Sequence, residues 1–69
     1  MKQLLAIALD EYHRTRAEFL RLCAEHRSAD YDEQDILRPQ IDAALDRWVA
    51  AQRRFERAYA THVGVTPPL

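Results

Sequence analysis

Apolar residues recur every three or four positions along most of this chain, the spacing that gathers them on one face of an α-helix. The one glycine and the three prolines all lie from Pro39 onward, so the first stretch predicts a single long helix over residues 2–27. Only Thr15 interrupts its seam, whose apolar positions are Leu5, Ala8, Tyr12, Phe19 and Leu22. Leu9, Leu20 and Cys23 widen this stripe, which suits a helix with more than one neighbour.

The apolar spacing stops at residues 28–31, which we expect to form a turn. Asp30 followed by Glu33 fits a capping box at the start of a second helix over residues 32–63. Within that helix Pro39 cannot donate to the carbonyl of Asp35, so we expect a kink or a separate first turn near Pro39. Gly64 suits a helix C-cap, and residues 64–69 are expected to leave as an extended tail.

The seam of the second helix is unbroken: it comprises Leu37, Ile41, Ala44, Trp48, Ala51, Phe55, Ala58 and His62. Two long helices joined by a short turn lie antiparallel, so residues whose numbers sum to about 60 should be neighbours. This register pairs Leu5 with Phe55, Tyr12 with Trp48, Phe19 with Ile41 and Leu22 with Leu37. The predicted fold is therefore all-α, an antiparallel two-helix hairpin in one domain.

A helix pair has no third element to cover the apolar positions that flank its seams, which are Leu9, Leu20, Leu45, Val49 and Tyr59. Exposed apolar area on this scale marks an interface, and two hairpins related by a two-fold axis close into a four-helix bundle. We therefore expect a homodimer. Its core or dimer seam is expected to contain Leu5, Tyr12, Phe19, Leu45, Trp48, Phe55 and Tyr59.

The length of the chain also favours a homodimer, because 69 residues bury little surface and such chains commonly need a disulfide, a metal or a second subunit for stability. The lone Cys23 excludes an internal disulfide framework and fits a reducing compartment, by default the cytoplasm. The first residues are too short and too acidic for a signal peptide, and no apolar run approaches the ~20 residues of a membrane span, so a soluble protein is expected. A net charge of −1 argues against a protein that coats nucleic acid or anionic membrane.

Catalytic and metal-binding chemistry finds little support in the chain. Asp10 and His13 have the spacing of a helical metal motif, but the facing helix offers no inward carboxylate. Cys23 has no sequence neighbour that would activate it, and on an amphipathic helix a cysteine commonly packs as a small apolar residue. We expect neither an enzyme nor a cofactor, and no small-molecule substrate.

The charged residues are more informative. On the first helix Asp10, Arg14, Glu18, Arg21 and Glu25 form an alternating ladder at helical spacing, typical of a solvated face. The second helix carries four arginines, here called the arginine patch: Arg47, Arg53, Arg54 and Arg57. Only Arg53 has an acid three or four residues away, so the patch is expected to be largely unpaired. The patch suits a partner contact, but cations near a helix C-terminus are also favourable in themselves. Nine of the ten basic residues of the chain are arginine, which fits either surfaces for bidentate contacts or a GC-rich genome.

Four acids lie within six residues at the turn: Asp30, Asp32, Glu33 and Asp35. Together with Tyr31 they are called the acidic tip. Negative charge at a helix N-terminus is favourable in itself, so capping explains the cluster in one interpretation. In the other, the tip presses on a basic partner surface with Tyr31 as an aromatic anchor.

Two function classes follow from these features. The first is a small helical protein-binding module, which needs no catalytic group. The second is a nucleic-acid-binding regulator that uses the arginine patch, although the net charge and the lack of a helix-turn-helix or basic-region pattern argue against it.

The length, the high arginine and alanine content and the Met-Lys start directly into a helix resemble the accessory proteins of Pseudomonas phages. In particular, the whole chain is similar to the small phage anti-quorum-sensing proteins. This resemblance implies a helical dimer in the host cytoplasm that binds and inactivates a LuxR-type transcription activator, and that also inhibits the type IV pilus assembly ATPase. It rests on size and character, and it carries no individual site residue over.

Overall fold

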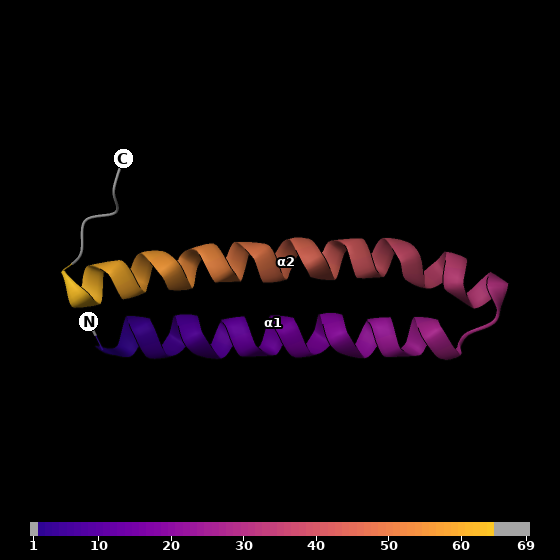
Figure 1. The fold of residues 1–69 in the computed structure, drawn as a ribbon, viewed down its shortest axis with the longest axis horizontal. Helices are drawn as coiled ribbons and strands as arrows, with labels where there is room; N and C mark the ends of the chain where they lie inside the picture. Colours follow the sequence, from indigo (N-terminus) through magenta and orange to yellow (C-terminus); the bar gives the residue numbers. More distant parts are fainter. Residues whose placement is uncertain (1, 65–69) are drawn as a thin grey trace.

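A computed structural model describes residues 2–64 of the chain. It contains two helices, α1 over Lys2–Ser28 and α2 over Tyr31–Val63, and no strand within residues 2–64. The helices lie side by side and run in opposite directions, so that the start of α1 and the end of α2 meet at one end (Figure 1). The prediction of an all-α fold built from two helices is confirmed.

The turn is shorter than the expected residues 28–31 and consists of Ala29 and Asp30 alone. Asp30 has extended backbone, and its carboxylate accepts a hydrogen bond from the backbone N–H of Glu33 at 2.9 Å. This side chain therefore supplies the expected N-cap, since it satisfies a donor that has no partner inside the helix. Tyr31, which the sequence placed in the turn, is instead the first residue of α2.

The other end of α2 is closed by Gly64. Its φ of 69° is left-handed, and its N–H is directed at the carbonyls of Ala60 and Thr61. Glycine adopts this conformation without the strain that a Cβ would add. The rest of the expected tail, residues 65–69, lies outside the described residues.

Pro39 does not interrupt α2, which continues through it, so the expectation of a separate first turn is wrong. The proline removes one donor, yet the neighbouring hydrogen bonds hold the helix together. The ribbon of α2 is gently bowed rather than sharply broken (Figure 1).

The contact between the helices is lined by small side chains. Ala51 is fully buried, Ala44 is 1% exposed, and Ala8 and Leu22 complete the buried set within the described residues. The large seam residues are only half-buried: Leu5, Tyr12, Phe19, Leu37, Ile41, Trp48 and Phe55. Trp48 and Phe55 were expected to fill the core. Within one hairpin they are left partly open because no third element lies over the seam.

Aromatic contacts establish the register. The ring of Tyr12 lies 6.4 Å from that of Trp48, as the predicted pairing required, and 6.0 Å from that of Phe55. The ring of Phe19 lies 5.4 Å from that of Trp48, which is seven residues beyond its predicted partner Ile41 on α2. Side chains on a helix lean toward its N-terminus, so in an antiparallel pair the tips meet at a larger residue sum than the backbones do.

Candidate functional site

The two lateral faces of the hairpin differ in chemistry. A helix advances 100° per residue, which places Glu11 and Glu18 on one side of the α1 seam and Leu9 and Leu20 on the other. Because the helices are antiparallel, positions displaced in the same rotational sense on both helices share one face of the pair. One face is therefore crossed by charges from both helices, and the opposite face is richer in large apolar side chains, with Arg16 and Glu56 also on it.

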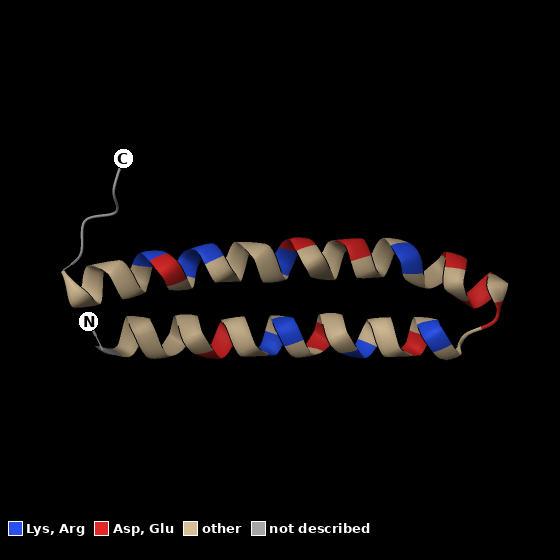
Figure 2. Ribbon diagram, viewed as in Figure 1, with Lys and Arg blue, Asp and Glu red and all other residues tan. Residues whose placement is uncertain are grey.

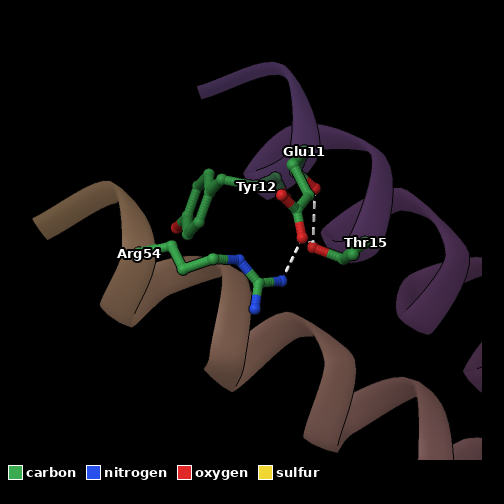
Figure 3. Close-up of polar contacts among 4 residues, drawn as sticks. All are labelled: Glu11, Tyr12, Thr15 and Arg54. Atoms are coloured by element: carbon green, nitrogen blue, oxygen red, sulfur yellow. Dashed lines mark hydrogen bonds and ion pairs between the residues drawn. The ribbon is translucent and has the colours of Figure 1, made fainter. Parts of the chain in front are cut away.

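Two ion pairs join the helices across the charged face, here called the paired face. Arg47 Nη2 lies 2.5 Å from Glu18 Oε1, and Arg54 Nη2 binds Glu11 Oε1 one heptad further along. Figure 3 shows the Arg54 side chain reaching from α2 to the carboxylate of Glu11. Both pairs are partly exposed, so each is worth only about 0.2–1 kcal/mol. They do, however, fix which residues of the two helices face each other.

Thr15 breaks the apolar seam without leaving its hydroxyl unpaired. Its Oγ1 donates to the Glu11 carbonyl, 2.8 Å away, and the Tyr12 carbonyl lies 3.0 Å from the same atom (Figure 3). A threonine can bond back to the preceding turn in this way at a small cost to the helix. Thr15 is therefore part of the hairpin's framework, next to the Glu11–Arg54 pair.

These contacts correct the expected charge pattern. Arg47 and Arg54 are paired with glutamates of the other helix, so the expectation that they are unpaired is wrong. The ladder on α1 is also interrupted: Arg14 binds Asp10 and Arg21 binds Glu25, while Glu18 turns to α2. Sequence spacing within one helix could not reveal these partners, because they lie 29 and 43 residues away along the chain.

The arginine patch is thus divided. Arg53 and Arg57 form no ion pair with any residue of the described range 2–64, whereas the other two members are engaged. Two free guanidinium groups are a small footprint for phosphate contacts. The structure therefore leaves fewer arginines for phosphate contacts than the sequence indicated, which weakens the nucleic-acid hypothesis.

The opposite side of the hairpin, here called the apolar face, carries six of the ten exposed large apolar residues within the described residues: Leu9, Leu20, Leu45, Val49, Tyr59 and Val63. All six are exposed in the single chain, and Tyr59 is exposed to 53%. Ile7, which is 61% exposed, lies instead on the same side of α1 as Glu11. The sequence placed Leu45 and Tyr59 in the core or dimer seam; in the hairpin alone they lie at its open edge. The apolar face continues into the half-buried aromatic seam, where the ring centroids of Tyr59 and Phe55 are 6.2 Å apart.

Trp48 stands at the centre of the aromatic row. Its indole N–H is buried, and no acceptor among the described residues lies within hydrogen-bonding distance. A buried donor without a partner costs about 1–3 kcal/mol. The hairpin therefore accommodates this ring for its apolar area, at a polar cost that the sequence did not indicate.

The acidic tip projects from the turn end, which Figure 2 shows as a run of acidic residues leading into α2. Asp30 is used as the helix cap, and Asp35 lies 3.7 Å from Arg38. Asp32 and Glu33 form no ion pair within the described residues, and Tyr31 is 88% exposed. Capping thus accounts directly for one acid of the four, and the other three carboxylates and the tyrosine ring face solvent.

A hollow of about 420 Å³ opens beside the tip, between the last turn of α1 and the first turns of α2. Its lining comprises Glu25, Ser28, Ala29, Glu33, Ile36 and Leu37. Of these, only Glu33 belongs to the predicted partner-binding set. Sequence analysis missed the others because the hollow is formed by both helices and appears only when their ends are juxtaposed.

Residues 2–64 contain no cluster of three or more metal-ligating side chains, and neither of the two helices has an apolar stretch that could cross a membrane. Cys23 is half-buried on α1. Comparison with known proteins finds no matching family model, curated protein or solved structure. A function can therefore be inferred only from the tip and the two lateral faces of the hairpin.

Proposed function

We propose that this chain is a non-enzymatic protein-binding module that dimerises through its apolar face and occupies the surface of a larger protein with its acidic tip. The observation that carries the proposal is the uncovered apolar face. Six large apolar side chains on one side of a small hairpin are far more than isolated surface residues, and such patches mark interaction sites.

The exposed area supports a second copy as the occupant of this face. The chain exposes 5532 Å², whereas a compact monomer of its mass exposes about 4,500 Å². An elongated hairpin, 49 × 26 × 13 Å in extent, exposes more area than a compact chain, and a second copy on the apolar face would cover part of it. Two hairpins packed by their apolar faces would form the four-helix bundle that the sequence predicts.

The choice of partner rests on the tip and on the resemblance to phage anti-quorum-sensing proteins. The tip offers solvent-facing carboxylates around an exposed aromatic ring, which complements a basic surface such as the DNA-reading surface of a transcription activator. The proposed target is accordingly a LuxR-type quorum-sensing activator, which the module would prevent from binding its operator. The type IV pilus assembly ATPase is the second partner that the resemblance implies.

The test uses a purified LuxR-type activator bound to labelled operator DNA. Addition of this protein should release the DNA and yield a co-eluting protein complex. Reversal of the tip charges that do not cap α2, with Asp32, Glu33 and Asp35 changed to lysine, should abolish both effects while the helical circular dichroism signal persists. Retained binding by this variant would remove the tip from the proposal.

Arg53→Glu with Arg57→Glu is the matched variant at the other end of the hairpin. If the tip carries the activator contact, this double variant should still release the operator DNA. A salt-dependent shift of random DNA by the wild-type protein would instead support the alternative, a nucleic-acid-binding regulator that uses the arginine patch. No shift at low salt would exclude that alternative.

A further inference from the structure

The lining of the hollow beside the tip contains apolar and acidic side chains, here called its floor and its rim. Ile36, which is 63% exposed, and Leu37 supply the floor from α2. Glu25 of α1 and Glu33 of α2 supply the rim, one carboxylate from each helix. We call this feature the tip groove.

The groove is open on only one side of the hairpin. On the other side, the Gln34 side chain donates to the carbonyl of His26 at 3.0 Å and ties the two helix ends together. On the groove side Ser28 and Ala29 are too small to fill the space between the helix ends. The opening therefore follows from the sequence of the turn: a long polar side chain bridges one side, and two short ones leave the other side empty.

The local charge favours a cation. Residues 25–38 hold five acidic and two basic side chains, a net charge of −3 in a chain whose total is −1. The Glu33 carboxylate forms no ion pair within residues 2–64, and that of Glu25 is shared with Arg21 at 2.7 Å. The terminal carbonyls of α1 add partial negative charge here and the N-terminus of α2 adds partial positive charge, so the carboxylates decide the sign of the local charge.

We propose that the tip groove receives an arginine from a basic amphipathic helix of the partner protein. The aliphatic stem would lie on Ile36 and Leu37, and the guanidinium would lie between Glu25 and Glu33. Arginine fits better than lysine because its planar group can bind two carboxylates and is more weakly hydrated. This inference deepens the proposed function and rests on it, since it names the group by which the tip recognises its partner.

A peptide titration tests the groove directly. The isotope-labelled full chain is titrated with a capped 16-residue helical peptide of alanine, leucine and arginine, in which leucine and arginine alternate at helical spacing. Saturable amide shifts are expected at Ser28, Ala29, Glu33, Ile36 and Leu37. A matched peptide with glutamine in place of arginine should bind at least about tenfold more weakly, as the loss of a charge-assisted contact requires.

Two variants separate the floor from the rim. Glu33→Gln removes the free carboxylate and keeps the backbone N–H that Asp30 accepts, while Ile36→Ala shortens the exposed floor. Each substitution should weaken the binding of the arginine peptide by about tenfold. Asp42→Asn is the control, an exposed acid on α2 outside the groove, and should leave the affinity unchanged. Circular dichroism establishes that all three variants keep their helicity.

The proposal is overturned if the shifts map elsewhere, if the glutamine peptide binds equally well, or if Ile36→Ala binds like the wild type. In the last case the tip attracts cations only through its general charge. If Glu33→Gln and Ile36→Ala still release the activator from its operator as well as the wild type, the groove is not the recognition site although the proposed function stands. If the peptide binds the groove but the wild-type chain leaves the activator on its DNA, the proposed function fails and the groove stands.

Discussion

At the scale of single residues, the hairpin is held at its closest point by alanines and not by its aromatic rings. Ala44 and Ala51 are the most deeply buried residues, while Trp48, Tyr12 and Phe55 keep part of their area exposed. Small side chains let two helix backbones approach closely, and the large rings then pack around the contact. The rings contribute area, and the alanines determine the distance between the helices.

Enlarging one of these alanines should therefore be costly. Ala51→Leu inserts three carbon atoms where no space is open, and overpacking of this kind destabilises by about 1–3 kcal/mol. Thermal unfolding followed by circular dichroism should show a lower midpoint. Ala43→Leu is the control, because Ala43 is exposed on the same helix and the two residue types have similar helix propensity. Equal midpoints for the two variants would show that Ala51 does not lie at a tight contact.

At the scale of the elements, local chemistry was predictable and cross-helix contact was not. The cap at Asp30 and the stop at Gly64 depend on residues within a few positions, so the sequence alone placed both. The Glu11–Arg54 and Glu18–Arg47 pairs have residue sums of 65, whereas the expected layers were built on sums of 60. The difference arises because long side chains lean toward the N-terminus of each helix, which a register drawn from backbone positions ignores.

The candidate site divides in the same way. The acidic tip is a local cluster, and its residues could be identified from the sequence. The tip groove joins Glu25 and Ser28 of α1 to Ile36 and Leu37 of α2, and the spacing within either helix gives no sign of it. The arginine patch was overestimated for the related reason that half of it is neutralised by the other helix.

The N-cap at the start of α2 should contribute measurably to the stability of the chain. Asp30→Ala removes the acceptor for the backbone N–H of Glu33 and should destabilise the chain by about 1 kcal/mol. Chemical denaturation measures the loss as a lower midpoint at constant slope. Asp42→Ala, an exposed aspartate within the same helix, should not lower the midpoint because it caps nothing. An equal loss in both variants would indicate a general charge effect instead of capping.

At the scale of the whole molecule, the two lateral faces of the hairpin differ in the balance of charged and apolar side chains. The paired face is crossed by two ion pairs, and charged side chains of this kind stay hydrated. The apolar face presents leucine, valine and tyrosine next to an aromatic row that is only half-buried. A second hairpin on this face would bury both the flanking residues and the open side of the rings, whereas a second hairpin on the paired face would have to desolvate the charges.

The proposed dimer should therefore dissociate when charges are placed on the apolar face, and it should tolerate substitutions on the paired face. Leu45→Glu with Val49→Glu places two charges on the apolar face and should convert the dimer to a monomer, measured by light scattering at micromolar concentration. Because subunit association and folding are linked, the wild-type melting temperature should rise with protein concentration and that of this variant should not. Glu11→Gln with Arg54→Gln on the paired face is the control and should remain dimeric. A wild-type chain that scatters as a monomer at all concentrations would contradict the dimer, and a monomeric paired-face variant would move the interface to the other side of the hairpin.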